Sequence, residues 1–171
     1  MAQEPLVLPE PTGPYAVGRT SFRWVDEDRP EVLSERSDDN REIAVLVWFP
    51  AQSTQCSESA PYLNDPDVLT VALSEDEASF LSSVQTHSID DAVLLAPEPT
   101  GIPVVLFSPG NGTFPALYTT HAEDLASHGY LVVVVDHPYD SIATRLSDGR
   151  IVEQATQPQG EERARVVRSC F

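Results

Sequence analysis

The sequence contains no lysine. All ten of its basic residues are arginine, against 27 aspartates and glutamates, so the 171-residue chain carries a net charge of −17. Nucleic-acid binding needs clustered positive charge, and this balance therefore argues against a nucleic-acid partner. The same shortage leaves no basic patch for an anionic membrane surface. A well-solvated acidic surface, typical of an arginine-rich or salt-adapted proteome, accounts for the composition.

Cysteine and long apolar runs are also scarce. Cys56 and Cys170 match no metal-ligand spacing, and two cysteines in a chain of this length do not form a disulfide scaffold. No apolar run approaches the length of a membrane span, and residues 1–15 lack the basic and apolar parts of an export signal. We therefore expect no metal site and no transmembrane segment, and a cytoplasmic location is the default expectation.

The N-terminal region predicts a hairpin behind an extended leader. Residues 1–17 hold four prolines and are expected to lie over the surface. Residues 18–30 alternate, with Phe22 and Trp24 on one side of a strand, and residues 41–51 form a second strand with apolar residues on both faces. Apolar residues on both faces predict an interior strand. The side chains expected in the core rather than on a ligand platform are Trp24, Trp48 and Phe49.

The rest of the chain alternates between strands and helices. Residues 51–66 are expected to form a loop, 67–83 short helical pieces, and 147–154 a turn with a brief strand, while 160–171 have the composition of a helix that begins. Strands at 103–107 and 130–136 should be parallel neighbours, joined by a right-handed crossover helix at 115–128. This order predicts an α/β three-layer sheet with a mixed edge.

A glycine-rich turn, Gly110-Asn111-Gly112, joins the first of these parallel strands to the helix. Turns of this kind hold an anion on backbone N–H groups. Two anions fit the description, namely the pyrophosphate of a dinucleotide and the oxyanion of an ester under attack.

The dinucleotide interpretation has one supporting residue and one opposing residue. Asp136 ends the next strand, where a ribose-binding acid would lie. Pro115, however, occupies the position of the third glycine of the fingerprint, and about a hundred residues of other structure precede the turn. A non-catalytic or nucleotide-binding α/β module that holds phosphate at Gly110-Asn111-Gly112 remains the alternative function.

The ester interpretation rests on the place of the turn. In α/β-hydrolases one oxyanion donor comes from the loop after the third strand, and the other from the residue after the nucleophile. Gly110 and Gly112 would allow a bend that exposes the N–H of Asn111. A preorganised donor of this kind contributes roughly 3–4 kcal/mol to lowering the barrier.

Six segments occur in an order that resembles the platelet-activating-factor acetylhydrolase family, α/β-hydrolases related to plasma lipoprotein-associated phospholipase A2. They are GPYAVGRTSFRWVDEDRPE, REIAVLVWFPA, APYL, VVLFSPGNG, LASHGYLVVVVDHPYDS and DGRIV. The oxyanion loop of the family typically reads Ser-His-Gly-Leu-Gly and aligns with residues 108–112. The resemblance thus assigns an oxyanion donor to the backbone N–H of Asn111. It implies hydrolysis of a short-chain ester, such as a phospholipid acetyl group, through a Ser-His-Asp acyl-enzyme without a cofactor.

The chain departs from the family pattern in one respect. Those enzymes carry the nucleophile in a Gly-x-Ser-x-Gly elbow, and no glycine of this sequence begins one. The triad Asp and His follow later still in the family. We therefore expect residues 18–171 to be an incomplete α/β-hydrolase domain, truncated before the elbow and inactive as it stands.

The four histidines do not supply a substitute triad. His121 and His128 lie seven apart on the predicted crossover helix, too far for a shared metal of the usual i, i+4 kind. Together with His87 they are expected to be solvated or capping residues. His137 follows a strand end, where ligand crevices form, so it is a candidate substrate-binding residue. A structural role in the turn of residues 136–140, which Asp136 and Asp140 would organise through bonds to the backbone, is favoured.

Overall fold

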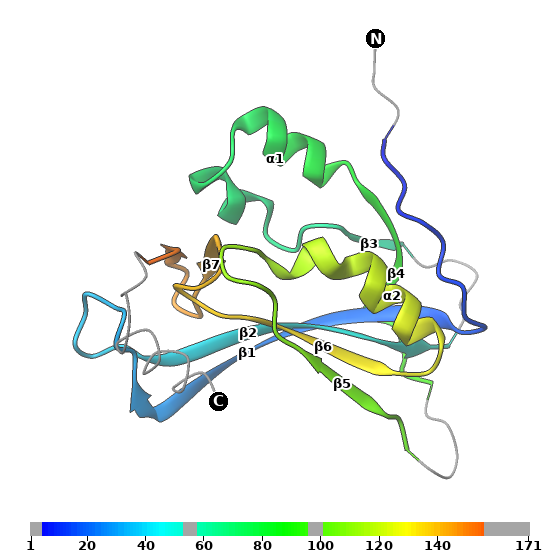
Figure 1. The fold of residues 1–171 in the computed structure, drawn as a ribbon, viewed down its shortest axis with the longest axis horizontal. Coiled ribbons are helices and arrows are strands. Elements are labelled where there is room, and N and C mark those ends of the chain that lie inside the picture. The colour runs from blue at the N-terminus through cyan, green and yellow to red at the C-terminus, as the bar shows by residue number, and fades with distance from the viewer. Residues whose placement is uncertain (1–4, 53–57, 96–100, 156–171) are drawn as a thin grey trace.

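The chain forms a mixed sheet with helices packed against it (Figure 1). A computed structural model describes residues 5–52, 58–95 and 101–155. In chain order the elements are β1 (Ala16–Pro30), β2 (Asn40–Ala51), β3 (Ser59–Pro61), the 3₁₀ helix η1 (Pro66–Val71), α1 (Glu75–Ser82), β4 (Gln85–Asp90), β5 (Val104–Phe107), the 3₁₀ helix η2 (Pro115–Tyr118), α2 (Thr119–Ser127), β6 (Leu131–Asp136), β7 (Ala143–Arg145) and β8 (Ile151–Glu153). The main sheet has the order β3-β4-β1-β2-β6-β5, and β7 and β8 form a separate hairpin.

The long hairpin of β1 and β2 is the centre of the sheet. The two strands are antiparallel, with Arg19 opposite Trp48 and Trp24 opposite Ile43. β2 lies between β1 and β6. Its two faces belong to two different hydrophobic clusters, one around Trp48 and one around Val45. The predicted hairpin and the predicted interior position of the second strand are confirmed.

Strands β5 and β6 are parallel neighbours, with Leu106 beside Val133. The segment between them is helical, so the predicted pair of parallel strands with a helical connection is confirmed. The α-helix is shorter than predicted because Pro115 begins a 3₁₀ turn, and α2 starts only at Thr119. β5 lies at the edge of the sheet, where its second side has no described partner strand.

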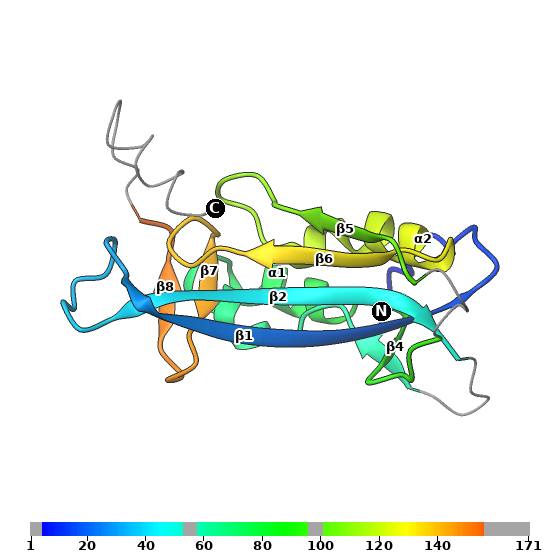
Figure 2. The same cartoon turned by 90° about the horizontal axis from the view of Figure 1, so that it is seen from below.

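The described helices cover one face of the sheet. Figure 2 shows strands β1, β2, β6 and β5 in front, with α1 and α2 behind them. On the covered face Trp48 packs with Ala122 and Ala126 of α2. On the other face, residues 91–95 run beside the end of β2, where Ala92 packs against the cluster that contains Phe49.

One prediction about the core is wrong. Trp48 and Phe49 are buried, but Trp24 is 50% exposed and stacks on Phe22, with ring centroids 5.7 Å apart. The reason lies in the sheet order, because β4 pairs only with residues 17–19 of β1 and leaves the outer part of that strand at an edge. Alternation in the sequence predicted the side of the strand correctly but not what covers that side.

Short elements account for the other differences. Residues 67–83 are helical as predicted, since η1 and α1 lie there, and β8 is the predicted brief strand. The predicted loop at 51–66, however, includes β3, while β4 and β7 were not predicted. Each is a strand of three to six residues whose partner is decided by tertiary contacts. The helix predicted at 160–171 lies outside the described residues.

The described part of the N-terminal leader is extended and attached to the domain. Leu8 N–H donates to the carbonyl of Gln85 in β4 at 3.0 Å, and Thr12 N–H donates to the carboxylate of Asp124 in α2 at 2.8 Å. Strand β1 begins at Ala16, so the end of the predicted leader belongs to the sheet.

Candidate functional site

The candidate site is the loop of residues 108–114, which leaves the carboxyl end of β5. Because β5 and β6 are parallel, this loop and the turn after β6 both follow the carboxyl ends of their strands and lie at the same end of the sheet (Figure 2). Ligands of open α/β sheets bind at this edge. The structure therefore brings the predicted residues 110–112 and His137 to one region of the molecule.

The backbone amides of the loop have distinct partners. Gly112 N–H donates to the carbonyl of Asp140 at 2.8 Å, and Thr113 N–H donates to the carbonyl of Gly110 at 3.2 Å. Gly110 N–H makes a long bond of 3.5 Å to the Tyr118 hydroxyl. Among the described residues no group accepts from the N–H of Asn111, an exposed residue. That amide is free to bind an anion.

Of the two glycines in the loop, one occupies a position that requires glycine and the other does not. Gly112 has a φ of +73°, and a Cβ there would lie 3.1 Å from the Gln154 side chain. Gly110 has no positive φ, and an added Cβ would meet nothing closer than 4.0 Å. The left-handed backbone at Gly112 thus forms the bend that places Asn111 at the surface of the loop.

His137 lies under the loop and contacts its first residue. The residue is 8% exposed, and Nε2 of its ring is 2.9 Å from Oγ of Ser108. Burial lowers the pKa of the imidazole, the Arg41 guanidinium lowers it further, and the Asp140 carboxylate opposes both. The ring is therefore neutral at pH 7. Its Nδ1 is buried and has no partner in the part of the chain that the structure describes.

Backbone hydrogen bonds close the turn after β6, and Asp136 contributes less to it than predicted. The carbonyl of His137 accepts from the N–H groups of Asp140 at 3.0 Å and Ser141 at 2.9 Å, which closes the turn. Tyr139 has a φ of +68°, a strained conformation for a non-glycine residue. Asp136 accepts from the Thr144 hydroxyl at 3.1 Å, so its described partner is a side chain and not the backbone of the turn.

Asp136 has an unusual electrostatic environment. Burial raises its pKa to about 6, while hydrogen bonds from Ser141 and Thr144 and the charge of Arg23 act in the opposite direction. The residue borders a cavity of about 90 Å³ on the helix-covered face, whose apolar lining includes Leu46 and Leu69. The raised pKa of Asp136 was not predicted from the sequence.

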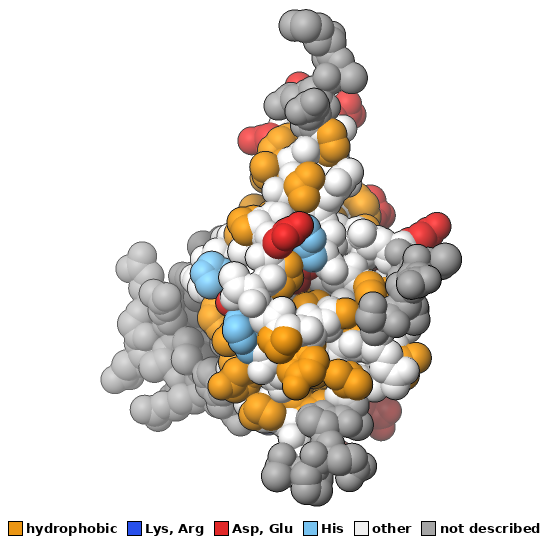
Figure 3. Space-filling view, turned by 90° about the vertical axis from the view of Figure 1, so that its right-hand side faces the viewer, with side chains coloured by type: hydrophobic (Ala, Val, Ile, Leu, Met, Phe, Trp, Pro, Cys, Tyr) orange, Lys and Arg blue, Asp and Glu red, His pale blue; other side chains and the backbone are white. Residues whose placement is uncertain are grey.

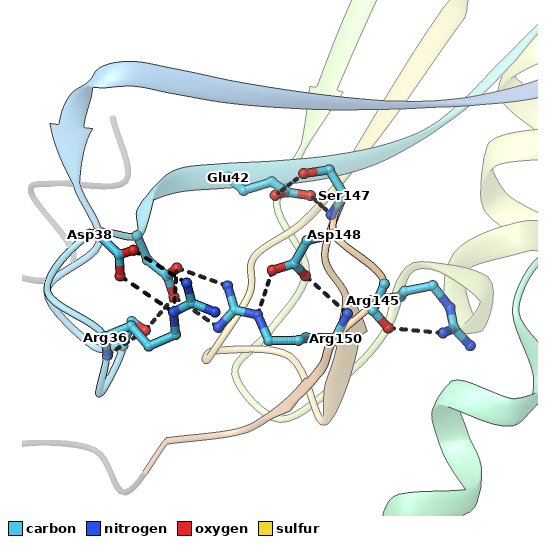
Figure 4. A network of polar contacts seen from close by, with 10 residues as sticks. Arg36, Asp38, Glu42, Arg145, Ser147, Asp148 and Arg150 are labelled. Carbon is cyan, nitrogen blue, oxygen red and sulfur yellow. Dashed lines mark hydrogen bonds and ion pairs between the residues drawn. The ribbon is translucent and has the colours of Figure 1, made fainter.

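A polar network holds the β7–β8 hairpin against the long hairpin (Figure 4). Arg150 donates to both carboxylate oxygens of Asp39 at 2.8 and 2.9 Å, and to Asp148. Glu42 of β2 accepts from the backbone N–H and the hydroxyl of Ser147. The hairpin carries Gln154 just beyond β8, and the Gln154 amide donates to the side-chain oxygen of Asn111. Gln154 thereby supports the side chain of Asn111, whose backbone N–H has no acceptor in the described part of the chain.

Sequence reasoning missed two contributors to the loop, Ser108 and Gln154. Ser108 is 29 residues from His137, and Gln154 is 43 residues from Asn111. Neither pair has a sequence signal, because each contact depends on how the loop, the turn and the β8 end pack together.

The remaining histidines stay apart from the site. His87 is bonded to the carbonyl of Leu8 at 2.7 Å, His128 to the hydroxyl of Thr12 at 3.0 Å, and His121 is exposed. Figure 3 shows histidine side chains separate from one another among hydrophobic and acidic ones. Within the described ranges, no group of three or more His, Cys, Asp or Glu side chains could hold a metal. No described helix is both long and apolar enough to cross a membrane.

The position of the glycine turn also bears on the dinucleotide interpretation. In that motif the phosphate lies on the N-terminus of the helix that follows directly. Here the four residues of η2 separate the turn from α2. Pro115 and Ala116 of η2 are buried and unavailable to a ligand.

Comparisons with known proteins agree on one family. The model of "Platelet-activating factor acetylhydrolase, isoform II" matches residues 2–167. A probable 1-alkyl-2-acetylglycerophosphocholine esterase of Arthroderma benhamiae is 26% identical over 164 residues, covering 85% of this chain and 41% of the relative. Platelet-activating factor acetylhydrolase of Canis lupus familiaris is 28% identical over 134 residues, with 76% and 28% covered.

A solved structure shares the fold. The ferulic acid esterase from Streptomyces cinnamoneus superposes with a TM-score of 0.72 at 32% identity, over 87% of this chain and 41% of that protein. The chain thus spans less than half the length of these relatives. The α/β-hydrolase type of fold and the predicted family are both confirmed. The chain belongs to the platelet-activating factor acetylhydrolase, isoform II, family.

Proposed function

We propose that the protein to which this chain contributes is a carboxylic ester hydrolase that cleaves short-chain esters, such as the acetyl group of a phospholipid. The observation that carries the proposal is the N–H of the exposed residue Asn111, which has no acceptor among the described residues and lies at the carboxyl ends of the parallel strands. The name of the fungal relative supports an acetyl ester as substrate, and the ferulic acid esterase supports ester hydrolysis more broadly.

In this proposal the Asn111 N–H is one of two oxyanion donors. A serine oxygen attacks the ester carbonyl, a histidine takes the serine proton, and the negative charge that develops on the carbonyl oxygen is bound by the amide. The histidine returns the proton to the leaving alcohol, and water then hydrolyses the acyl-serine. In this proposal the nucleophile, the base and the orienting acid come from residues outside this chain. The outer side of β5 supports this, because it has no partner among the described strands and a further parallel strand there would end beside the loop.

The proposal predicts different behaviour for the chain alone and for a protein extended through a Gly-x-Ser-x-Gly elbow. The DNA that follows the codon for Phe171 is expected to encode that elbow. The 171-residue chain should hydrolyse p-nitrophenyl acetate at the background rate and resist labelling by a fluorophosphonate. The extended protein should be labelled and active. Labelling and turnover by the short chain would contradict the proposal.

The role of the Asn111 amide is tested in the extended protein. Asn111→Pro removes the N–H and should lower kcat by about 10²- to 10³-fold. Asn111→Ala is the matched control, because it keeps the N–H while losing the contact with Gln154. It should retain most of the activity. Equal losses in the two variants would remove the amide from the mechanism.

The alternative, a phosphate-binding module, is tested on the 171-residue chain by titration with NAD, ATP and FMN. Under the esterase proposal none of these should bind saturably at micromolar concentration. Saturable binding that Gly112→Ala abolishes would favour the module.

A further inference from the structure

We propose that Ser108 and His137 act as one positioning unit for the loop that presents the Asn111 amide. The catalytic meaning of this unit depends on the proposed function, but the unit itself is a property of the folded chain. Neither residue would touch the reacting atoms. Both would act by holding the loop in the shape that leaves one N–H unpaired.

The geometry attaches the loop to the turn after β6 at two points on either side of Asn111. On one side, Oγ of Ser108 lies 2.9 Å from Nε2 of His137. On the other, Gly112 N–H donates to the carbonyl of Asp140 at 2.8 Å. His137 and Asp140 belong to the same turn, which their own bond of 3.0 Å closes. The intervening residues 109–111 are therefore held at both ends by one rigid element.

The tautomer of His137 follows from its surroundings. Nδ1 is buried and unpartnered among the described residues, whereas Nε2 faces the serine hydroxyl. A buried N–H without an acceptor is rarer in proteins than an unpaired acceptor. The proton of the neutral ring therefore lies on Nε2 and is donated to Oγ of Ser108. The exposed hydroxyl of Ser108 then accepts from His137 and donates its own proton to water.

The same observation separates a positioning pair from a nucleophile and its base. A catalytic histidine must receive the serine proton on an unprotonated nitrogen, and an acid on its other nitrogen holds it in that tautomer. No described acid accepts from Nδ1 of His137. With the proton on Nε2, the ring cannot take a second proton from Ser108.

The experiment is a double-mutant cycle read by hydrogen exchange. In the 15N-labelled 171-residue chain, the exchange rates of the Gly112 and Val134 amides are measured by NMR in Ser108→Ala, His137→Phe and the double variant. Each single change should accelerate Gly112 exchange roughly 3- to 10-fold, because one hydrogen bond that restrains the loop is lost. The double variant should exchange no faster than the faster single variant. Val134, buried in β6, should keep its rate.

Two further variants test chemistry against packing. His137→Gln retains an amide N–H donor and should restore slow Gly112 exchange to within about threefold of the parent. His121→Gln, at an exposed position of α2, is the matched control and should change nothing. A 15N spectrum of the parent ring should show the Nε2–H tautomer.

Several results would overturn the proposal. These are additive effects in the double variant, equal acceleration at Val134, failure of His137→Gln to rescue, or an Nδ1–H tautomer. Fluorophosphonate labelling of Ser108 would replace the positioning role by a nucleophilic one. None of these readouts requires ester hydrolysis, so the positioning unit can fail while the proposed function stands, and the reverse also holds.

Discussion

Strand β2 presents Trp48 to the face of the sheet that α2 covers, whereas β1 presents Trp24 to the face that no described helix covers (Figures 1 and 2). Trp48 is fully buried and Trp24 is half exposed. The edge strand β5 continues the contrast, since Val105 packs into the Trp48 cluster while Leu106 on the opposite side is 68% exposed. Residues of similar hydrophobicity thus differ in burial: Trp24, beyond the part of β1 that β4 pairs with, and Leu106, on the edge strand, are exposed, while the centre of their face is buried.

Buried polar groups occur on both faces of the sheet. The covered face buries the guanidinium of Arg19 and the carboxylate of Glu123, and it carries Asp136. Burial lowers the pKa of Arg19, while the charges of Asp90 and Glu123 oppose the shift. The other face combines apolar side chains, among them Ile43 and Val45, with the buried ion pair of Arg41 and Glu31. Since Val45 on this second face is only 2% exposed, the described helices alone do not decide which side chains leave water.

The largest expected effect compares the two tryptophans. Trp48→Ala should lower the free energy of unfolding by about 3–5 kcal/mol, because it leaves a cavity under α2. Trp24→Ala should lower it by about 1 kcal/mol, since half of that side chain is already in water. Urea denaturation followed by circular dichroism measures both. Similar losses would show that the second face is covered in solution.

The next effect concerns the buried carboxylate of the covered face. Oε1 of Glu123 accepts from the backbone N–H groups of His87 at 3.0 Å and Ser88 at 2.8 Å. Glu123→Gln keeps the shape but removes the charge that faces Arg19, and should cost about 2–3 kcal/mol. Glu153→Gln, at an exposed position of β8, is the control and should be neutral. A neutral Glu123→Gln would mean that Arg19 does not depend on this charge.

Ionisation of Asp136, on the covered face, makes the free energy of unfolding depend on pH. Its pKa is about 6 in the folded chain and about 3.9 when unfolded. Between these values the folded chain binds more protons, so this carboxyl lowers stability as the pH rises from about 4 to 6. Asp136→Asn removes the effect. The stability of the variant relative to the parent should therefore rise by on the order of 2 kcal/mol across this range.

Urea titrations of both proteins at several pH values measure this difference. A constant offset between them would show that Asp136 ionises normally. Because the comparison subtracts the other titrating groups, including His137, it isolates the one carboxyl.

The smallest effect belongs to the uncovered face. The rings of Phe22 and Trp24 are stacked, 5.7 Å apart and within 7° of parallel. A double-mutant cycle with Phe22→Ala and Trp24→Ala should give a coupling energy of about 0.5–1 kcal/mol. No coupling would indicate that the pair does not remain stacked in solution.

Local patterns in the sequence predicted a large part of the fold. Alternation predicted the hairpin, and apolar residues on both sides of residues 41–51 predicted an interior strand, because each strand residue faces one of only two sides. The glycine turn after β5 was located by its place between a strand and a helix. Strands β3 and β7 were missed because three residues carry too little pattern. Trp24 was misplaced because burial depends on a neighbouring element that alternation does not contain.

The sequence likewise predicted only part of the candidate site. The sequence located residues 110–112 and the end of β6, since motif and strand order depend on neighbouring residues. It did not indicate that Ser108 meets His137, that Gln154 meets Asn111, or that the amide of residue 111 lacks an acceptor among the described residues.

The sequence by itself determined the charge of the chain, the two-sided character of β2 and the family that its ordered segments resemble. Only the tertiary structure decided which face of the sheet is covered, which carboxyl has a raised pKa and which loop amide is free. The physical reason is the separation along the sequence over which each effect acts. Alternation and turn chemistry act over a few residues, whereas burial and hydrogen bonding of a loop depend on groups that are distant in sequence and meet only when the sheet forms.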